Sequence, residues 1–192
     1  MRDPSPLQPA TDDELRQLMR RYQAGEVEAF EEIYARTLTM VRGYLAALTV
    51  DRSLTLDLVQ DVYLQMHRSR QTYDPTRPVK PWVAGITRHV WLMARRSYAR
   101  RRSPEITGLE EAIDLSVAPD FEPFAARATL ARALAAVPSD QREAVVLHHF
   151  YGLSFREIAR VAGVSEGAAR IRASRGMHGL RRHLGPSGAH HG

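Results

Sequence analysis

Residues 153–168 read LSFREIARVAGVSEGA, and this stretch decides the fold of the C-terminal part of the chain. Ser154 and Glu157 have the S-x-x-E spacing of a capping box, in which two side chains bond the free backbone amides at the start of a helix. Gly163 suits the tight turn that follows, because glycine adopts a left-handed backbone without strain, and Ser165 can cap a second helix. Two helices joined in this way form a helix-turn-helix, a motif whose second helix enters the major groove of DNA.

The second helix of this motif is strongly basic. Between residues 166 and 182 it carries five arginines and a single acid, Glu166. Arg170 and Ser174 are one turn apart with Arg175 beside them, so the three side chains share a face. An arginine there can bond the O6 and N7 of guanine, which contributes roughly 1–3 kcal/mol to base discrimination. The alternative is a solvated basic face on a helix pair that does not bind DNA, and the spacing does not separate base-reading from phosphate-holding arginines.

The composition is that of a globular, basic protein. The chain has 192 residues, 27 basic and 22 acidic side chains and a formal net charge of +5, and all of its basic residues except Lys80 are arginine. The lack of cysteine excludes a disulfide scaffold, an iron–sulfur cluster, a thiolate zinc site and a cysteine nucleophile. No apolar run approaches the ~18 residues of a membrane span, and residues 1–10 lack the apolar stretch of a signal peptide. We therefore expect a soluble cytoplasmic protein without membrane insertion, with nucleic acid as the first candidate partner and an anionic membrane surface as the second.

The N-terminal half follows helical spacing throughout, and no stretch alternates as a strand would. Four helices are predicted, with Thr11 capping the first, Gly25 ending it and Pro81 starting the fourth. They span residues 12–24, 27–51, 55–70 and 81–102. The apolar residues expected to face the core include Val27, Tyr34 and Met93. This half is therefore predicted to be a helical bundle.

An acidic linker is expected between two helical domains. Residues 103–123 hold six acids and no basic residue, and prolines punctuate the segment. Helical spacing returns at Phe124. The expected short helices span residues 124–137, 139–150, 154–162 and 165–184. We predict an all-α chain with domains at 12–102 and 124–184 and disordered ends at 1–11 and 185–192.

The fourth helix of the bundle has a second, basic face. Arg88, Trp91 and Arg95 lie opposite its apolar stripe. An aromatic ring among arginines on an exposed stripe suits stacking on unpaired bases and contact with phosphates. The alternative is that Trp91 covers a neighbouring helix while the arginines are simply solvated.

Two carboxylates on the third helix raise the question of metal chemistry. Asp57, Gln60 and Asp61 fall on one polar face at i, i+3 and i+4, but no nearby histidine or glutamate completes a ligand set. His148 and His149 are adjacent, so they point about 100° apart and make a poor metal pair. We therefore expect no metal, no cofactor and no catalytic residue; a metal-dependent nucleic-acid hydrolase using Asp57 and Asp61 is the enzyme alternative.

Several segments together resemble one known family. They are 57–68 (DLVQDVYLQMHR), 81–89 (PWVAGITRH), 137–142 (VPSDQR), 152–159 (GLSFREIA) and 164–167 (VSEG). The first two resemble region 2, and the other three region 4, of bacterial sigma factors of the sigma-70 family. The match runs in order from about residue 12 to residue 184. Because no third domain fits between residues 102 and 124, the chain resembles the compact extracytoplasmic-function group.

This resemblance implies a non-enzymatic factor that binds core RNA polymerase and directs it to promoter DNA. The face of Asp57, Gln60 and Asp61 would contact the clamp helices of the polymerase large subunit. The acidic linker would thread toward the RNA exit path, and an anti-sigma factor is an expected further partner. A stand-alone helix-turn-helix regulator is the alternative; it would bind duplex DNA by itself and have no use for this polar face.

The resemblance also assigns promoter contacts to both domains. The minus-10 element would be met by Tyr73, Lys80, Arg88, His89, Trp91 and Arg95. The minus-35 element would be met by Arg142, Arg170, Ile171, Arg172, Ser174 and Arg175. Tyr73 falls in the loop that holds a flipped base, and His89 takes the place of the usual asparagine in that pocket. Ile171 replaces a polar reader and could touch a thymine methyl group.

Overall fold

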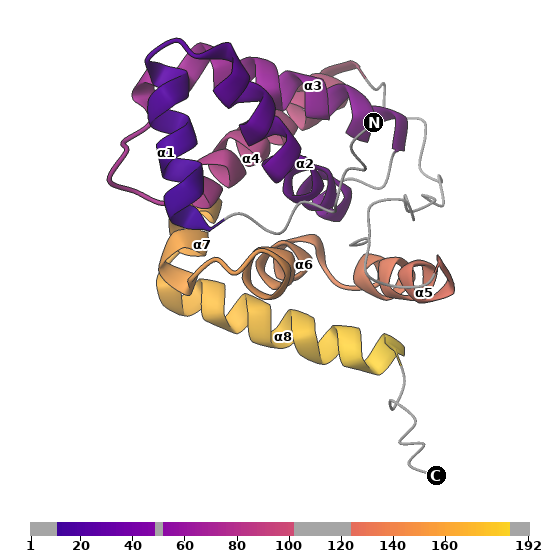
Figure 1. Ribbon diagram of the computed structural model, residues 1–192. Coiled ribbons are helices and arrows are strands. Elements are labelled where there is room, and N and C mark those ends of the chain that lie inside the picture. The colour runs from indigo at the N-terminus through magenta and orange to yellow at the C-terminus, as the bar shows by residue number, and fades with distance from the viewer. Residues whose placement is uncertain (1–10, 49–51, 102–123, 185–192) are drawn as a thin grey trace.

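The computed structural model describes residues 11–48, 52–101 and 124–184, and every regular element in these ranges is a helix (Figure 1). The N-terminal helices are α1 (Asp12–Gln23), α2 (Val27–Leu48), α3 (Arg52–Ser69) and α4 (Val79–Arg101), with a 3-10 turn at Arg70–Thr72. The C-terminal helices are α5 (Phe124–Ala135), α6 (Ser139–Val145), α7 (Phe155–Ala162) and α8 (Glu166–Leu184), with a π-helical turn at Val146–Phe150. The all-α prediction is confirmed. The expected linker and both expected disordered ends, apart from Thr11, lie outside the described residues.

The four N-terminal helices share one hydrophobic core. The apolar residues of α1 recur every three or four positions, so one face of the helix is buried. The fully buried side chains of the bundle include Leu15, Met19, Ile33, Val41, Leu45, Val62, Met66 and Val83. This core packs α3 against α4, and the outer surfaces of these two helices carry the candidate sites of the domain.

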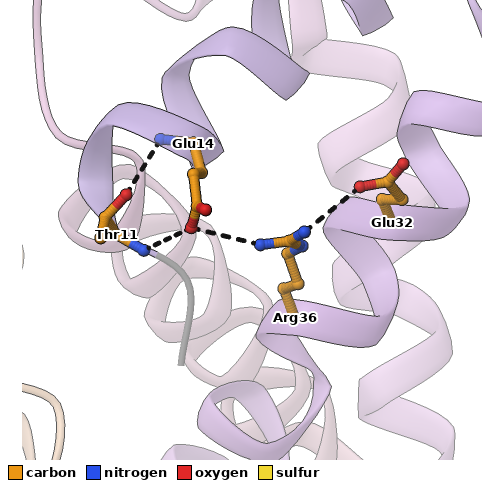
Figure 2. Close-up of polar contacts among 4 residues, drawn as sticks. All are labelled: Thr11, Glu14, Glu32 and Arg36. Carbon is orange, nitrogen blue, oxygen red and sulfur yellow. Dashed lines mark hydrogen bonds and ion pairs between the residues drawn. The ribbon is translucent and has the colours of Figure 1, made fainter. Parts of the chain in front are cut away.

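A capping box fixes the start of α1 and ties this helix to α2 (Figure 2). The Glu14 amide donates to the Thr11 hydroxyl at 3.3 Å, and the Thr11 amide donates to the Glu14 carboxylate at 2.9 Å. The Arg36 guanidinium of α2 reaches the same carboxylate at 3.3 Å and Glu32 at 3.5 Å. The predicted Thr11 cap is thus confirmed, and the Thr11 amide, more than any other group, lowers the pKa of Glu14.

The helix-turn-helix of the C-terminal domain forms as its sequence predicts. The Glu157 amide donates to the Ser154 hydroxyl at 3.3 Å, and the Ser154 amide donates to the Glu157 carboxylate at 2.8 Å, which completes the capping box of α7. Gly163 ends α7 with a φ of 68°, the left-handed conformation that glycine adopts at little cost. The Ala168 amide donates to the Ser165 hydroxyl at 3.1 Å, so Ser165 caps α8.

Helix α8 crosses α6 at Gly176, where the two backbones approach closely. A Cβ atom at this position would lie 2.7 Å from the Gln141 carbonyl oxygen and 2.7 Å from Val145 Cγ2. The first of these atoms belongs to the backbone, so α6 itself would have to move. The glycine therefore sets the distance between the two helices.

Gly176→Ala is expected to destabilise the protein although alanine favours helices. Overpacking costs about 1–3 kcal/mol, and the clash with a backbone atom places this site in the upper part of that range, at about 2–3 kcal/mol. Because the better helix propensity returns about 1 kcal/mol, we expect a net loss of about 1–2 kcal/mol in the free energy of unfolding. Gly167→Ala is the matched control on the same helix, because a Cβ there has no neighbour within 4 Å. It should stabilise the protein by about 0.4–1 kcal/mol. Chemical denaturation measures both changes, and equal effects of the two substitutions would contradict this account.

The two domains pack against each other through a second apolar cluster. Tyr44 and Leu48 of α2 and Ala84 of α4 meet the C-terminal domain there. Their buried partners are Ala144, Leu147, Leu153, Ile158, Ala169 and Ala173. Figure 1 shows α6 and α7 placed between the N-terminal bundle and α8.

Some helix boundaries and core assignments differ from the sequence prediction. α4 begins at Val79 instead of Pro81, because proline is tolerated anywhere in the first turn, where amides need no helical partner. The single helix expected over 139–150 is α6 followed by the π-helical turn. Val27, Tyr34 and Met93 were expected in the core and are exposed. Helical spacing gives the direction of a side chain but not whether a neighbouring helix extends far enough to cover it.

Candidate nucleic-acid and polymerase interfaces

The polar face of α3 is open to solvent. Asp57, Gln60 and Asp61 are all exposed, and Leu64 continues the same stripe one turn further along. The two carboxylates line a groove of about 540 Å³ between α3 and α4, together with Leu64 and exposed Met93. An exposed surface of mixed acidic and apolar character suits contact with another protein.

The described residues hold no group of three or more His, Asp or Glu side chains that could bind a metal ion. His148 stacks on Phe155 with ring centroids 4.2 Å apart, and its Nδ1 lies 2.8 Å from the Leu153 carbonyl oxygen. His149 is exposed on the next position of the π-helical turn. Both histidines thus lie at the surface of the C-terminal domain, His148 half-buried and His149 exposed.

A pocket of about 450 Å³ lies where the 3-10 turn meets α4. Tyr73, Trp82 and His89 line it, with the Tyr73 and Trp82 rings 5.2 Å apart. The loop is held in place because the Gln23 side-chain amide donates to the carbonyl oxygens of Arg70 and Tyr73 at 2.8 and 2.9 Å. The aromatic lining suits stacking of a planar ring such as a nucleobase.

Within this pocket, Tyr73 is mainly a supporting residue. Its side chain is buried, its hydroxyl donates to the Arg77 carbonyl, and burial raises the pKa of Tyr73 to about 12. Trp82 is half-buried, and no binding role was predicted for it from the sequence. The sequence feature that could have indicated its position in the pocket is that it closely follows the proline-containing turn that carries Tyr73. Lys80 is half-buried at the start of α4 and is not among the residues that line the pocket.

The stripe of Arg88, Trp91 and Arg95 is only partly exposed, which differs from an open face and agrees with the alternative in which Trp91 covers a neighbouring helix. Trp91 is half-buried and packs against the cores of both domains. The Arg95 guanidinium is exposed and lies 5.5 Å from the centre of the Trp91 ring. Arg88 Nε is paired with Glu143 Oε1 of α6 at 2.8 Å. The stripe is covered because the C-terminal domain packs on this part of α4.

The outer face of α8 brings together four of the residues expected at the minus-35 element. Arg170, Ile171, Ser174 and Arg175 are all exposed, at positions that share one side of the helix. The Arg170 guanidinium lies 5.1 Å from the centre of the Phe155 ring of α7 and 3.3 Å from the Glu166 carboxylate of α8. These two contacts orient the Arg170 side chain. This face is therefore basic, with one apolar residue, Ile171, and the side chains of all four residues are exposed to solvent.

Two expected minus-35 residues do not belong to this outer face. Arg172 is half-buried and its Nε lies 3.2 Å from the Asp140 carboxylate of α6. Arg142 of α6 exposes only 9% of its surface. His178, by contrast, is exposed one turn beyond Ser174 and lines two grooves with it. The sequence feature that could have placed His178 on this face is its position four residues after Ser174, one helical turn further on.

Within the described ranges, no helix combines the length and the apolar character that crossing a membrane requires. The long helices α2, α4 and α8 all carry charged residues along their length.

Comparison with known proteins identifies two sequence families along the chain. Residues 33–101 match the family model described as "Sigma-70 region 2", and residues 127–178 match "Sigma-70, region 4". RNA polymerase sigma factor CarQ of Myxococcus xanthus is 38% identical over 169 residues, which cover 87% of this chain and 95% of that protein. ECF RNA polymerase sigma factor SigF of Caulobacter vibrioides is 30% identical over 171 residues, covering 88% of this chain and 93% of that protein.

Solved structures share the same fold. The sigma factor RpoE from Bartonella quintana, determined with the anti-sigma factor NepR, gives a TM-score of 0.65 at 22% identity and covers 82% of this chain and 98% of that one. CnrH, determined with the cytosolic domain of CnrY, gives a TM-score of 0.63 at 24% identity and covers 87% of this chain and 94% of that one.

Proposed function

The chain belongs to the sigma-70 family, and from this premise we propose how its two domains divide the work of an extracytoplasmic-function sigma factor that directs core RNA polymerase to promoters. The observation that carries the proposal is the pairing, on one chain, of an unobstructed basic helix-turn-helix face with a pocket whose aromatic rings, Tyr73 and Trp82, belong to a separate helical domain. The first suits duplex DNA and the second suits an unpaired base.

The N-terminal domain, residues 12–102, is proposed to hold the melted minus-10 strand. A flipped base would enter the pocket beside Trp82 and His89, above the buried Tyr73. Arg95 and Trp91 would follow the adjoining strand, since a guanidinium stacked near an aromatic ring serves both phosphate and base. Lys80 and Arg88 would add positive charge at the two ends of this surface.

The C-terminal domain, residues 124–184, is proposed to read the minus-35 duplex with the outer face of α8. Arg170 and Arg175 are the candidates for bidentate contacts with guanine, and Ile171 for contact with a thymine methyl group. Ser174 and His178 would bond base edges or phosphates on the same side. Arg172 would instead hold α8 to α6 through Asp140, and Arg142 would act only if α6 moves.

The polar face of Asp57, Gln60 and Asp61 is proposed to bind core polymerase. It is exposed while the two domains are packed together and Arg88 is paired with Glu143, so the approach of polymerase does not require the domains to separate. The linker at 103–123 would tether the two domains, so that two weak DNA contacts act together through their effective concentration.

The factor is proposed to act by binding alone, without catalysis, in the cytoplasm where promoter DNA and polymerase lie. Capture of unpaired bases by the N-terminal domain would drive melting of the minus-10 DNA. The C-terminal domain would meanwhile hold the factor on the upstream minus-35 duplex. An anti-sigma factor is proposed as a further partner, in line with the NepR and CnrY complexes of the two structures of the same fold.

A mobility-shift experiment separates this function from that of a stand-alone regulator. Promoter DNA should be shifted at nanomolar concentrations by the chain together with core polymerase, and only weakly by the chain alone. Equal binding of the duplex with and without polymerase would favour the stand-alone regulator.

A further inference from the structure

We propose that a cleft between the π-helical turn and α8 binds a phosphate of the DNA backbone beside the minus-35 bases, and that its histidines take up protons when the phosphate enters. The inference rests on the proposed function, because it takes the outer face of α8 as the surface that meets the minus-35 duplex. It adds a phosphate site next to that surface and makes the affinity for the duplex depend on pH.

Polar and basic side chains surround this cleft, which has a volume of about 290 Å³. They are His148 and His149 of the π-helical turn and Arg170, Ser174, His178 and Arg181 of α8. Among the described residues that line the cleft, none is an acid; the Glu166 carboxylate pairs with Arg170 at 3.3 Å without being one of them. Imidazole and guanidinium groups gathered in this way suit an anion with several acceptor oxygens.

The position of the cleft favours DNA as the source of the phosphate. Arg170 and Ser174 line the cleft and also belong to the exposed outer face of α8. When a recognition helix enters the major groove, the phosphates of the two strands run along its sides, and side chains there hold the backbone. A duplex met by the outer face of α8 therefore carries its backbone past this cleft.

The contacts of His148 determine which of its ring nitrogens carries a hydrogen in the free chain. Its Nδ1 lies 2.8 Å from the Leu153 carbonyl oxygen, and because a carbonyl oxygen can only accept, Nδ1 is the protonated nitrogen. Stacking on Phe155, with ring centroids 4.2 Å apart, holds the ring in this orientation. In the neutral ring Nε2 has a lone pair and no hydrogen, so it can donate to a phosphate oxygen only after it gains a proton.

The surroundings of His149 favour its neutral form until an anion arrives. Its ring lies 4.7 Å from that of His148; partial burial lowers the pKa of His149, and the charges of His148 and Arg181 lower it further. The charged or titratable groups that face it from α8 are Arg170, His178 and Arg181. α7 contributes one uncharged ring, Phe155, and α2 and α6, which also pack on this turn, contribute no lining residue. A phosphate among these groups attracts the added proton, so binding draws a proton onto the ring.

Binding of the minus-35 duplex is therefore expected to strengthen as the pH falls. Each proton that is taken up raises the affinity by up to about tenfold per pH unit, because the proton enters the binding equilibrium. Histidines ordinarily titrate near pH ~6.5, so part of this gain is already spent on the free chain at low pH. For the full chain we expect binding about tenfold tighter at pH ~6.5 than at pH ~7.5.

Substitution of the two histidines of the turn tests the source of the protons. His149→Gln keeps a polar side chain at an exposed position but cannot take up a proton, and its gain over the same pH range should fall to about threefold. His148→Gln with His149→Gln should lose nearly all of the gain. His183→Gln is the matched control, because His183 is exposed in the last turn of α8 and is not among the residues that line the cleft, so this variant should keep the full gain.

The probe is a short fluorescent duplex from a promoter at which the chain and core polymerase start transcripts. Anisotropy with the full chain at micromolar concentration gives the affinity, and the ionic strength is held constant because DNA binding depends on salt. Single methylphosphonate replacements then remove the charge of one phosphate at a time. The pH dependence should vanish for replacements at neighbouring positions beside the minus-35 element and persist for all others.

Equal pH dependence in the wild type, His149→Gln and the double variant would overturn the proposal, because other groups would then take up the protons. So would a pH dependence that no single methylphosphonate removes. Inorganic pyrophosphate tests the other source of phosphate: micromolar binding to the chain in calorimetry, lost in His149→Gln, would assign the cleft to a free phosphorylated compound instead of DNA. Promoter-specific transcripts with unchanged pH dependence in the variants reject the cleft alone, whereas absent transcripts reject the sigma-factor role and the cleft with it.

Discussion

Replacing Asp57 and Asp61 together by arginine is expected to weaken binding of the chain to core RNA polymerase by about 100-fold or more. Both carboxylates are exposed on α3, so their replacement leaves the bundle intact. At an interface that has evolved for acidic side chains, a reversed charge meets like charge and costs several kcal/mol, and each ~1.4 kcal/mol is tenfold in affinity. Binding of labelled polymerase by fluorescence anisotropy measures the loss.

The control for this variant is the same change of charge on another helix. Glu28 and Glu31 are exposed on α2, and Glu28→Arg with Glu31→Arg alters the net charge equally. If this control loses as much affinity, the effect is one of overall charge. If Asp57→Arg with Asp61→Arg binds polymerase as the wild type does, the polar face of α3 is not the docking surface.

Replacing Arg170 and Arg175 together by alanine is expected to lower the affinity of the polymerase holoenzyme for minus-35 DNA by about 100-fold. Each good bidentate contact with guanine contributes roughly 1–3 kcal/mol, so the loss of two such contacts lowers the affinity by about 25-fold to about 20,000-fold. Both side chains are exposed, and the domain should keep its stability. Competition between promoter DNA and a duplex with a scrambled minus-35 element reports the loss of specificity.

Arg132→Ala is the control for non-specific charge, because Arg132 is exposed on α5, away from the outer face of α8. It should lower binding to both duplexes slightly and equally. Retained discrimination in the Arg170→Ala, Arg175→Ala variant would show that the outer face of α8 does not read the promoter.

The local architecture of the helix-turn-helix could be predicted because each signal acts within a few residues. Ser154 and Glu157 bond each other across three positions. Gly163 adopts the left-handed backbone conformation, which glycine reaches without strain because it has no Cβ atom. These contacts can be predicted from the local sequence without knowing how the rest of the chain packs. The order of helices and the all-α class followed from the same kind of short-range pattern.

The direction of individual arginines could not be predicted in this way. Arg170 and Arg172 are two positions apart, yet one lies on the exposed face and the other pairs with Asp140 of α6. The helical spacing separates their directions by about 200°, but only the position of α6 decides which direction is solvent. The resemblance also assigned Arg142 to the minus-35 contacts, and its side chain is buried instead.

The contact between the domains left no trace in the local sequence. Glu143 follows a short polar stretch, SDQR at 139–142, and there it resembles an ordinary surface acid of a helix start. Its partner Tyr44 lies 99 positions earlier in the chain, and Arg88 lies 55 positions earlier. Such pairs arise from tertiary packing, on which helical periodicity carries no information.

Run-off transcription with purified core polymerase tests the central claim most directly. The wild-type chain should make core polymerase start transcripts at discrete sites in a library of genomic promoter fragments, and Asp57→Arg with Asp61→Arg should abolish these starts. Transcripts that are independent of the added chain across the whole library would contradict the account.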